Sequence, residues 1–178
     1  MDRGDRESAI ARMQGSLECM HTDHFQLVQV HNLRGWEAQL PTPREWKQEG
    51  RIKYLGITTL STRQFGEMER IMTREDLDFI QINYATDARD AADRILPLAT
   101  DRGMGVLVNL PFGRGRLFSR VGEPDPPDRA SEIDCESWGQ FFLKFKYVVS
   151  PSHGGVRRRA PGGAEPQGLR SRRALPRG

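Results

Sequence analysis

Four short apolar segments recur along this chain at an almost constant interval, and each is followed by a helical pattern. They end at His31, Thr58, Tyr84 and Asn109, so successive ends lie 27, 26 and 25 residues apart. A parallel strand needs a crossover helix before the next parallel strand can form, so this interval is typical of repeated βα units. Side chains at the carboxyl ends of such strands gather at one edge, where βα folds hold their active sites.

The four segments have the composition of strands that are covered on both faces. We expect strands at 25–30, 52–58, 79–84 and 106–109. Because side chains alternate along a strand, Gln29 and His31 would share one face while Val28 and Val30 point to the other. The polar side chains would then line the active-site mouth, and the valines would pack against helices.

Apolar stripes between these strands predict the crossover helices. The first stripe consists of Ile10, Met13, Leu17 and Met20. Residues 36–49 predict a second helix, which ends at Gly50. Ser61 and Gln64 have the spacing of a capping box at the start of a third helix. Asp87 is the expected N-cap of a fourth helix, which ends at Gly103.

The length of the chain and its uneven charge divide it into two parts. At 178 residues it is shorter than a complete eight-unit βα barrel, which typically has about 250. Residues 151–178 hold seven arginines against one acid and no aromatic residue. Such a segment cannot bury enough apolar surface to offset the entropy of ordering. We therefore expect one α/β domain over residues 1–150 and a disordered Gly/Pro/Arg-rich tail over 151–178.

Several classes of site are disfavoured. Cys19 and Cys135 lack the spacing of a disulfide framework or a zinc site, so we expect no metal and a reducing, cytoplasmic location. The run from Cys19 to His24 bridges a helix end and a loop without a further ligand at zinc spacing. No stretch approaches the roughly 18 apolar residues of a membrane span. The tail arginines lack interleaved aromatic residues, so we expect no specific nucleic-acid partner.

His31 is the strongest catalytic candidate from its position alone. A histidine at the carboxyl end of a parallel strand can donate a hydrogen bond to a substrate carbonyl or relay a proton near neutral pH. The alternative is a histidine that only hydrogen-bonds a neighbouring loop.

Several motifs in combination resemble the aldo/keto reductases. They are QVHN at 29–32, EGRIKYLGIT at 49–58, QINY at 81–84 and the run DRILPLATDRGMGVLVNLPFGRGRLF at 93–118. The resemblance covers about residues 5–148 in unbroken order. It implies a (β/α)8 TIM barrel, of which this chain would hold roughly units three to seven. It also implies NADP-dependent reduction of a small-molecule carbonyl compound, with hydride from NADPH and without a metal.

The resemblance assigns a role to residues at each strand end. It implies that His31 orients the substrate carbonyl beside a catalytic tyrosine. Thr58 and Thr59 stand where the family has a Ser-Asn pair that holds the nicotinamide carboxamide, and Gln81 matches the glutamine that completes this grip. Asn109 stands where many members place an aromatic ring against the nicotinamide.

The resemblance also implies a phosphate-binding loop and two missing parts. Phe112, Gly113 and Arg114 lie in the segment that wraps the cofactor pyrophosphate in the family. The family's catalytic tyrosine, aspartate and lysine precede the helix that begins near residue 5, and the eighth strand would follow residue 148. We therefore expect an oxidoreductase lineage whose catalysis is impaired in this chain. The alternative is a non-catalytic barrel fragment that self-associates through open sheet edges or complements another chain.

Overall fold

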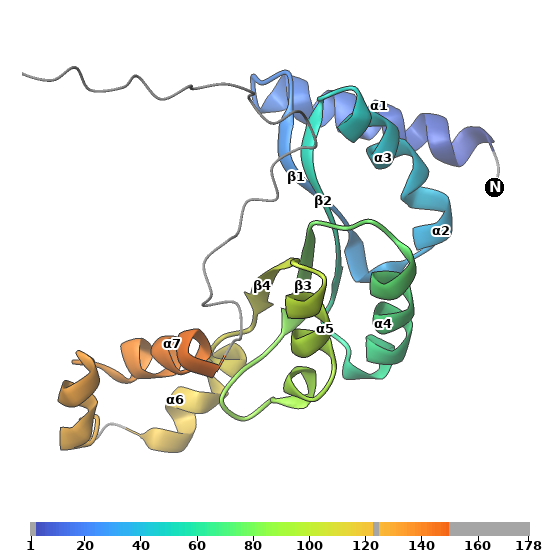
Figure 1. Ribbon diagram of the computed structural model, residues 1–178. Coiled ribbons are helices and arrows are strands. Elements are labelled where there is room, and N and C mark those ends of the chain that lie inside the picture. Colours follow the sequence, from blue (N-terminus) through green and yellow to red (C-terminus); the bar gives the residue numbers. More distant parts are fainter. Residues whose placement is uncertain (1–2, 123–124, 150–178) are drawn as a thin grey trace, which may run out of the picture.

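A computed structural model describes residues 3–122 and 125–149 of the 178-residue chain. Strands and helices alternate along it, as the interval of the apolar segments predicts (Figure 1). In order, the strands and α-helices are α1 (Arg3–Cys19), β1 (Phe25–Val30), α2 (Trp36–Gln39), α3 (Pro41–Gln48), β2 (Ile52–Thr59), α4 (Phe65–Arg74), β3 (Phe79–Asn83), α5 (Ile95–Asp101), β4 (Gly105–Asn109), α6 (Arg116–Val121) and α7 (Trp138–Val149). Short 3-10 turns are η1 (His31–Leu33), η2 (Thr62–Gln64), η3 (Asp90–Ala92), η4 (Gly113–Gly115) and η5 (Asp128–Ile133).

The four strands form one parallel sheet in the order β1-β2-β3-β4. Each strand therefore pairs with the strand that precedes it in the sequence. One register row crosses the whole sheet through Gln29, Gly56, Phe79 and Gly105. This arrangement confirms the predicted parallel α/β fold, and the strand bounds agree with the prediction to within one residue at each end.

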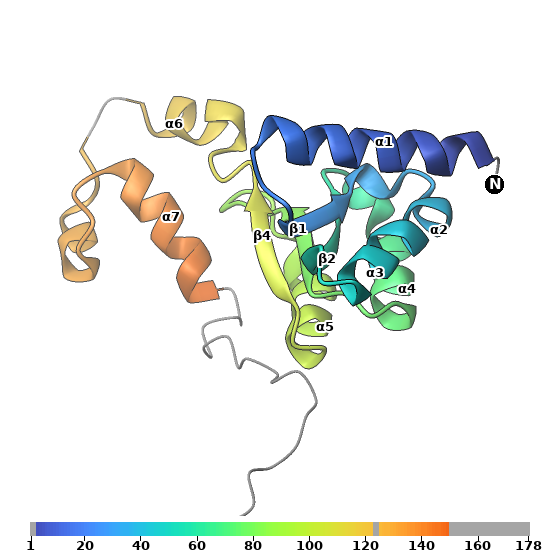
Figure 2. The ribbon, with the colours of Figure 1, turned by 90° about the horizontal axis from the view of Figure 1, so that it is seen from above.

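Helices α2 to α5 cover one face of this sheet, which we call the outer face (Figures 1 and 2). Ile57, Ile80 and Ile82 point to the outer face and are fully buried. They belong to the main apolar cluster, to which α4 contributes Met68 and Met72. Alternating side chains of parallel strands thus meet the helix layer, as the valine and isoleucine pattern predicts.

The opposite face, which we call the inner face, has no such helix layer. By alternation and register it carries Leu27, Gln29, Tyr54, Gly56, Thr58, Phe79, Gln81, Asn83, Gly105, Leu107 and Asn109. Leu107 is 38% exposed and Tyr54 is 37% exposed, which is high for large apolar side chains within a sheet. Tyr54 packs edge-on against Phe79, with ring centroids 5.3 Å apart.

Two glycines make room for Phe79 on the inner face. A Cβ atom at Gly105 would lie 2.3 Å from the Phe79 ring, and one at Gly56 would lie 2.5 Å from the Phe79 backbone oxygen. Either approach is shorter than carbon atoms tolerate, so a Cβ atom at Gly56 would meet fixed backbone, and one at Gly105 would require the Phe79 ring to move. The glycines let the Phe79 ring lie across β4.

Residues 36–49 form two short helices where the sequence predicted one. The break falls at Leu40, between α2 and α3. Pro41 lacks the N–H that would continue the hydrogen-bond ladder of α2, but it is well suited to the first position of α3. The predicted end at Gly50 is confirmed, with a φ of 78°.

The helical segment after β2 begins directly after Ser61, as predicted, but the side-chain caps predicted for the two later helices do not form within the described residues. The Ser61 side chain caps nothing in the described structure; instead, the Thr59 hydroxyl accepts the Ser61 N–H at 3.0 Å and donates to Gln64 Oε1 at 2.6 Å. Asp87 caps no helix either, because α5 begins only at Ile95. Arginines from α6 contact the Asp87 carboxylate instead.

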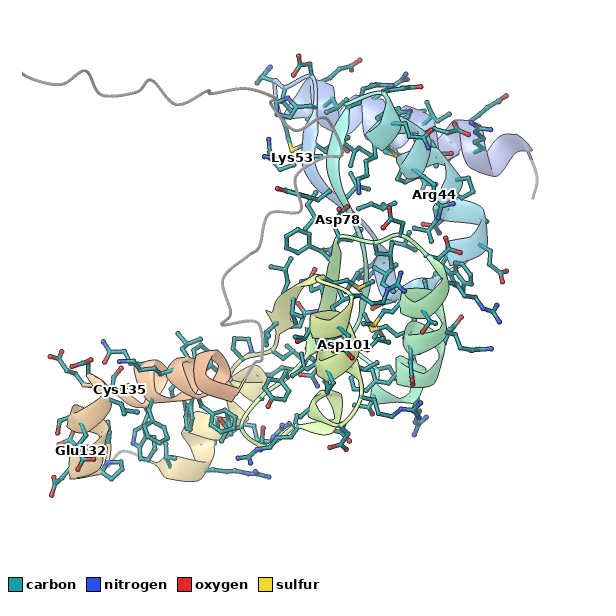
Figure 3. The ribbon with its side chains drawn as sticks, viewed as in Figure 1. Arg44, Lys53, Asp78, Asp101, Glu132 and Cys135 are labelled. Atoms are coloured by element: carbon teal, nitrogen blue, oxygen red, sulfur yellow. The ribbon has the colours of Figure 1, made fainter. Side chains whose placement is uncertain are left out.

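Charged pairs tie the start of β3 to the helix layer. Asp78 Oδ2 accepts the N–H of Leu55 at 2.8 Å and an N–H of Lys47 at 2.5 Å. Arg44, one turn earlier on α3, pairs with Glu75. Figure 3 labels Arg44, which comes from α3, and Asp78, which comes from the turn before β3. These pairs join α3, β2 and the turn before β3.

The last two helices lie apart from α2 to α5, beyond β4 (Figures 1 and 2). They share a small apolar cluster built on Ala85, Leu117 and Phe142. The Trp138 and Phe142 rings stack in it with centroids 5.5 Å apart. The predicted tail over 151–178 lies outside the described residues, so the division of the chain into two parts stays a prediction.

Candidate functional site

The carboxyl-terminal half of the inner face is polar. Thr58 pairs in register with Gln81, and Asn83 pairs with Asn109. All four side chains point away from the outer helix layer, so three neighbouring strands present hydroxyl and amide groups at one end of the sheet. We call this set of four residues the polar rim. Its members can form hydrogen bonds but carry no charge.

A hydrogen bond links two of the rim side chains. Gln81 Nε2 donates to Asn109 Oδ1 at 2.5 Å. Asn109 lies one row beyond Leu107, the register partner of Gln81, so the two amides meet diagonally across β3 and β4. Both residues are half-buried. The bond joins the side chains of two neighbouring strands, β3 and β4, on the inner face.

Thr58 and Thr59, predicted to act together, lie on opposite faces. Thr58 belongs to the polar rim and is 6% exposed. Thr59 pairs with Ile82 on the outer face and is fully buried, with its hydroxyl engaged by Gln64 and Ser61. The structure therefore brings only Thr58 to the face that carries Gln81. The predicted cofactor contact of Thr59 stays a prediction.

His31 begins η1 at the carboxyl end of β1, directly after Val30. Val30 pairs with Ile57, so the backbone of His31 emerges at the level of Thr58. The imidazole is exposed. Gln64 holds the turn that follows, because its Nε2 atom donates to the Asn32 backbone oxygen at 3.2 Å. His31 is thus available at the same end of the sheet as the polar rim.

The predicted phosphate loop follows β4 and has an unusual backbone. Gly113, Arg114 and Gly115 have φ values of 57°, 58° and 87°, a left-handed run that glycine adopts readily and arginine rarely. The Arg116 side chain folds back over this loop. A Cβ atom at Gly113 would lie only 3.0 Å from Arg116 Nη2. Glycine at this position therefore lets a guanidinium approach the backbone closely.

The three predicted residues of this loop differ in their surroundings. Arg114 is exposed and Gly113 is buried. The Phe112 ring lies against Phe118, with centroids 5.0 Å apart, and packs on the cluster of α6 and α7. Phe112 thus anchors the loop, while the charge of Arg114 faces solvent.

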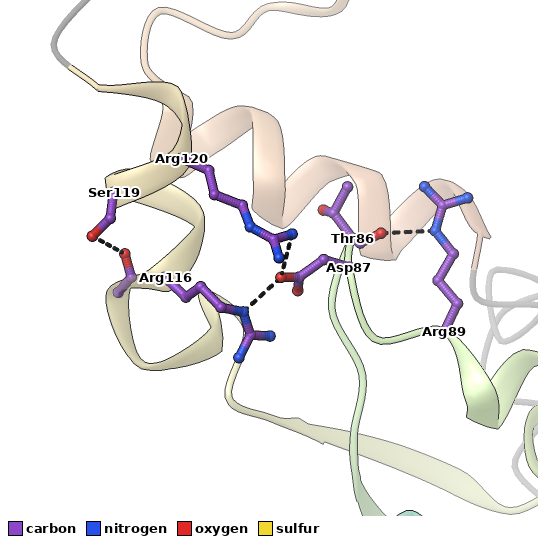
Figure 4. A network of polar contacts seen from close by, with 7 residues as sticks. Thr86, Asp87, Arg89, Arg116, Ser119 and Arg120 are labelled. Carbon is purple, nitrogen blue, oxygen red and sulfur yellow. Dashed lines mark hydrogen bonds and ion pairs between the residues drawn. The ribbon is translucent and has the colours of Figure 1, made fainter.

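Asp87 holds α6 through two arginines, whereas the sequence predicted that it caps a helix. Its Oδ2 atom accepts hydrogen bonds from Arg116 Nε at 2.8 Å and Arg120 Nη1 at 3.1 Å (Figure 4). The hydrogen bond from Arg116 is the main reason why the Asp87 pKa lies below its ordinary value. Asp87 thereby fastens α6, and with it the left-handed loop, to the segment after β3. Arg116 follows Asp87 by 29 positions and Arg120 follows it by 33, so the sequence around Asp87 carries no signal for these contacts.

Other candidate chemistry is not assembled in the described residues. Among residues 3–122 and 125–149, no three His, Cys, Asp or Glu side chains converge as metal ligands would. His24 ends the run from Cys19 that was not expected to bind metal. Its Nδ1 atom lies 2.7 Å from Asp23 Oδ1, and its Nε2 atom lies 2.9 Å from Gln26 Nε2. Tyr84 is fully buried in the main apolar cluster, where its ring packs. No helix in this part of the chain has the length and apolar character of a membrane span.

Comparison with known proteins identifies one family. The sequence profile of the aldo/keto reductase family matches residues 1–147. Many solved aldo-keto reductases have a similar fold. The apo form of an enzyme from Bacillus halodurans is 25% identical over 67% of this chain and 41% of its own, with a TM-score of 0.53.

Two further solved structures cover more of this chain. An aldo/keto reductase from Brucella melitensis is 16% identical over 81% of this chain and 54% of its own, with a TM-score of 0.58. One from Klebsiella pneumoniae, in complex with NADP and acetate, is 18% identical over 83% and 51%, with a TM-score of 0.59. This chain therefore spans about half the length of the solved structures that it matches. Its fold is part of a (β/α)8 TIM barrel.

Proposed function

Because this chain belongs to the aldo/keto reductase family, we propose that its polar rim is the nicotinamide end of an NADP(H) site in a carbonyl reductase lineage. One observation carries the proposal: Gln81 and Asn109 are hydrogen-bonded on the inner face, and Thr58 lies in register beside Gln81. His31 emerges at the same end of the sheet. The rim thus supplies amide and hydroxyl groups for a carboxamide, and His31 supplies a group for a substrate carbonyl.

The residues present fit a dinucleotide that carries an amide at one end and phosphates further along. The rim side chains are uncharged donors and acceptors, which suit a carboxamide. The loop of Phe112, Gly113 and Arg114 offers an exposed arginine between two glycines, Gly113 and Gly115, whose backbone a phosphate group can approach closely. The Klebsiella pneumoniae enzymes solved with NADP or NADPH support this choice of cofactor.

The proposed chemistry divides between cofactor and protein. When bound, NADPH supplies the hydride for an aldehyde or ketone. His31 donates a hydrogen bond to the carbonyl oxygen of the substrate and so favours the charge that develops there. Thr58 and Gln81 hold the nicotinamide carboxamide, and Asn109 adjoins the ring.

We further propose that the 178-residue polypeptide has little reductase activity by itself. The matched residues include His31 but no counterpart of the family's tyrosine, aspartate and lysine, and grouped catalytic residues act as a unit. An NADPH-oxidation assay with a panel of aldehydes and ketones tests this, together with NADPH titration followed by fluorescence. We expect NADPH binding with turnover far below about 1 per second. Turnover at or above that rate would contradict the impairment, and absence of NADPH binding would contradict the proposed site.

A second candidate function is association through the open sheet. β1 and β4 are the edges of the described sheet, and the inner face exposes Tyr54 and Leu107. Unpaired parallel edges beside an apolar face favour pairing with another chain. Size-exclusion chromatography with light scattering distinguishes a defined dimer from a monomer or an aggregate. A monomer at all concentrations would exclude this candidate.

The cellular setting is part of the proposal. Both cysteines are free, with Cys135 buried and Cys19 exposed, which supports a reducing compartment such as the cytoplasm. The substrate class is a small carbonyl compound. A thiol titration of protein purified without reductant checks the redox state, since the proposal requires two reactive thiols per unfolded chain.

A further inference from the structure

The outer edge of β4 presents a row of backbone groups to solvent. The Gly105 N–H donates to the Asp78 backbone oxygen at 2.8 Å, so Gly105 directs its backbone toward β3. Successive residues of a parallel strand direct their backbone groups to opposite sides. Val106 and Val108 therefore direct theirs to the open side, where no strand pairs with β4 within the described residues. Their side chains pack against the main apolar cluster, which holds the strand in place.

The outer edge of β1 is the counterpart at the other side of the sheet. The Phe25 N–H donates to the Arg51 backbone oxygen at 2.8 Å, so Phe25 directs its backbone toward β2. By the same alternation, Gln26 and Val28 direct their backbone groups away from β2. A parallel continuation of the sheet therefore pairs β4 of one molecule with β1 of another.

The inner face lacks the cover that parallel sheets require. Such sheets occur almost only with both faces covered, yet Tyr54 and Leu107 remain more than a third exposed on this face. Eight parallel strands close into a barrel whose interior is just wide enough for side chains to fill. The described sheet has four strands, all of them parallel. Two copies of the chain thus supply the number of strands that closes a barrel.

The area of the inner face favours closure over simple stacking of two such faces. Four strands of about five residues, at about 3.3 Å per residue and about 4.8 Å between strands, cover roughly 300 Å² in projection. A stable interface needs about 800 Å² of accessible surface from each partner. Stacked inner faces alone fall short of that area. Closure adds two strand edges with their backbone hydrogen bonds, together with contacts between the adjoining helices.

We propose that two copies of this chain associate around a twofold axis into one eight-stranded parallel barrel. β4 of each copy pairs with β1 of the other, and the two inner faces form a common interior. The proposal rests on the second candidate function, association through the open sheet, and names its partner and its geometry. Both free edges of each chain are used, so assembly stops at two copies. The polar rims of both copies then lie at one mouth of the barrel.

The attachment of the last two helices is compatible with this pairing. Their apolar cluster is built on Ala85, Leu117 and Phe142, and neither Val106 nor Val108 belongs to it. Arginines of α6 bind the Asp87 carboxylate, which follows β3. Helices α6 and α7 are therefore attached to the segment after β3 rather than to the outer edge of β4.

Sedimentation equilibrium of the full chain tests the edge pairing. Wild type should form a dimer of twice the 20.3 kDa of the chain. Val106→Pro removes a backbone donor from the outer edge of β4 and leaves the pairing with β3 intact, as proline does on edge strands. The dissociation constant should rise at least about tenfold, because each dimer loses two edge hydrogen bonds. Val106→Ala is the matched control, because it removes the same side chain and keeps the N–H.

Leu107→Glu tests the common interior independently of the edges. Below the dissociation constant the inner face is open to solvent, so the glutamate is hydrated in the monomer. In the barrel two such charges are buried, and the dissociation constant should rise at least about a hundredfold. Leu60→Glu is the matched control, because Leu60 is also 38% exposed but lies beyond the end of β2. It should keep the dimer. Circular dichroism verifies that each variant stays folded.

Hydrogen exchange followed by NMR identifies the edges that pair. The amides of Gln26, Val28, Val106 and Val108 should exchange more slowly in the concentrated dimer than in the dilute monomer. The Leu107 amide faces β3 by the same alternation, so it should be protected at both concentrations. Protection that appears on β4 and not on β1 would indicate that two β4 edges pair with each other, and closure would be wrong.

The outcomes separate this inference from the proposed functions. A wild-type dimer that persists in folded Val106→Pro or in folded Leu107→Glu associates through another surface, which overturns the barrel and leaves the candidate function of association standing. A wild type that stays monomeric at all concentrations excludes both. Assemblies larger than a dimer also contradict twofold closure. NADPH titration of the same samples tests the NADP(H) site by itself, since that site is proposed for each chain and not for the dimer alone.

Discussion

The two faces of the sheet obey different physical constraints, although the same four strands build both. On the outer face, Leu55, Ile57 and Ile80 are at most 1% exposed against a complete helix layer. On the inner face, Tyr54 and Leu107 remain more than a third exposed, and the polar rim lies beside them. The outer face therefore carries the stability of the described domain, and the inner face is free to carry chemistry. Identical substitutions on the two faces should have unequal effects.

The largest difference is expected between two leucines. Leu55→Ala on the outer face should lower the free energy of unfolding by about 2–5 kcal/mol, because it leaves a cavity in a sealed core. Leu107→Ala on the inner face should cost under about 1 kcal/mol, because this side chain is already partly in water. Urea unfolding followed by circular dichroism measures both. Equal losses would mean that the inner face is covered in solution.

Two glycines of the inner face provide the next comparison. Gly56→Ala should cost about 1–3 kcal/mol, because the new Cβ atom meets the fixed backbone oxygen of Phe79. Gly105→Ala should cost less, because its obstacle is the Phe79 ring, which can turn on an open face. Chemical denaturation of both variants gives the order. A larger loss for Gly105→Ala would show that the ring is held in place.

Adjacent threonines allow the same chemical change on each face. Thr59→Val should cost about 1–3 kcal/mol, because it leaves partners at Gln64 and Ser61 without their hydrogen bonds. Thr58→Val should cost less than Thr59→Val, because the hydrogen bonds with Gln64 and Ser61 are made by the Thr59 hydroxyl. Thermal unfolding at matched concentration compares the two. A costly Thr58→Val would indicate a hydrogen bond on the inner face.

The smallest expected effect concerns a buried hydroxyl beside the outer core. The Tyr84 hydroxyl has no hydrogen-bond partner in the described structure, so Tyr84→Phe should be neutral or slightly stabilising. Burial raises the Tyr84 pKa. The folded state therefore favours the neutral phenol. The contribution of the neutral Tyr84 phenol to the free energy of unfolding is fully present below the unfolded pKa of about 10. It is lost as the pH rises through the folded pKa.

Stability measured from neutral to alkaline pH checks this sign. Wild type should lose stability above about pH 10, and Tyr84→Phe should lose less over the same range, since it has no phenol to ionise. Parallel curves for the two proteins would mean that other groups dominate the alkaline transition. A clearly destabilised Tyr84→Phe at neutral pH would reveal a partner for the hydroxyl.

The sequence predicted the strands better than the helix starts, and the reason is physical. Strand positions follow from short segments with alternating apolar residues, such as FIQI, and this signal depends only on immediate neighbours. Helix starts depend on competition for polar side chains. Asp87 has the local features of an N-cap, yet Arg116 and Arg120 reach it from a distant segment. Contacts with residues so far along the chain leave no pattern in the sequence around Asp87.

The candidate site was partly predictable for the same reason. Parallel strands bring their carboxyl ends together, so the convergence of Thr58, Gln81 and Asn109 follows from spacing alone. The separation of Thr58 from Thr59 also follows from strand alternation, but family resemblance treats the two as one motif. The bond between Gln81 and Asn109 could not be foreseen, because it depends on a diagonal contact between rotamers on adjacent strands.

The order of strands in the sheet has a consequence for biosynthesis. Because β1, β2, β3 and β4 are translated in their spatial order, every described strand after β1 finds a partner that has already been made. Each new unit can dock on the growing edge soon after it leaves the ribosome. The growing edge is open only until the next unit arrives, which limits the time for misassembly at that edge.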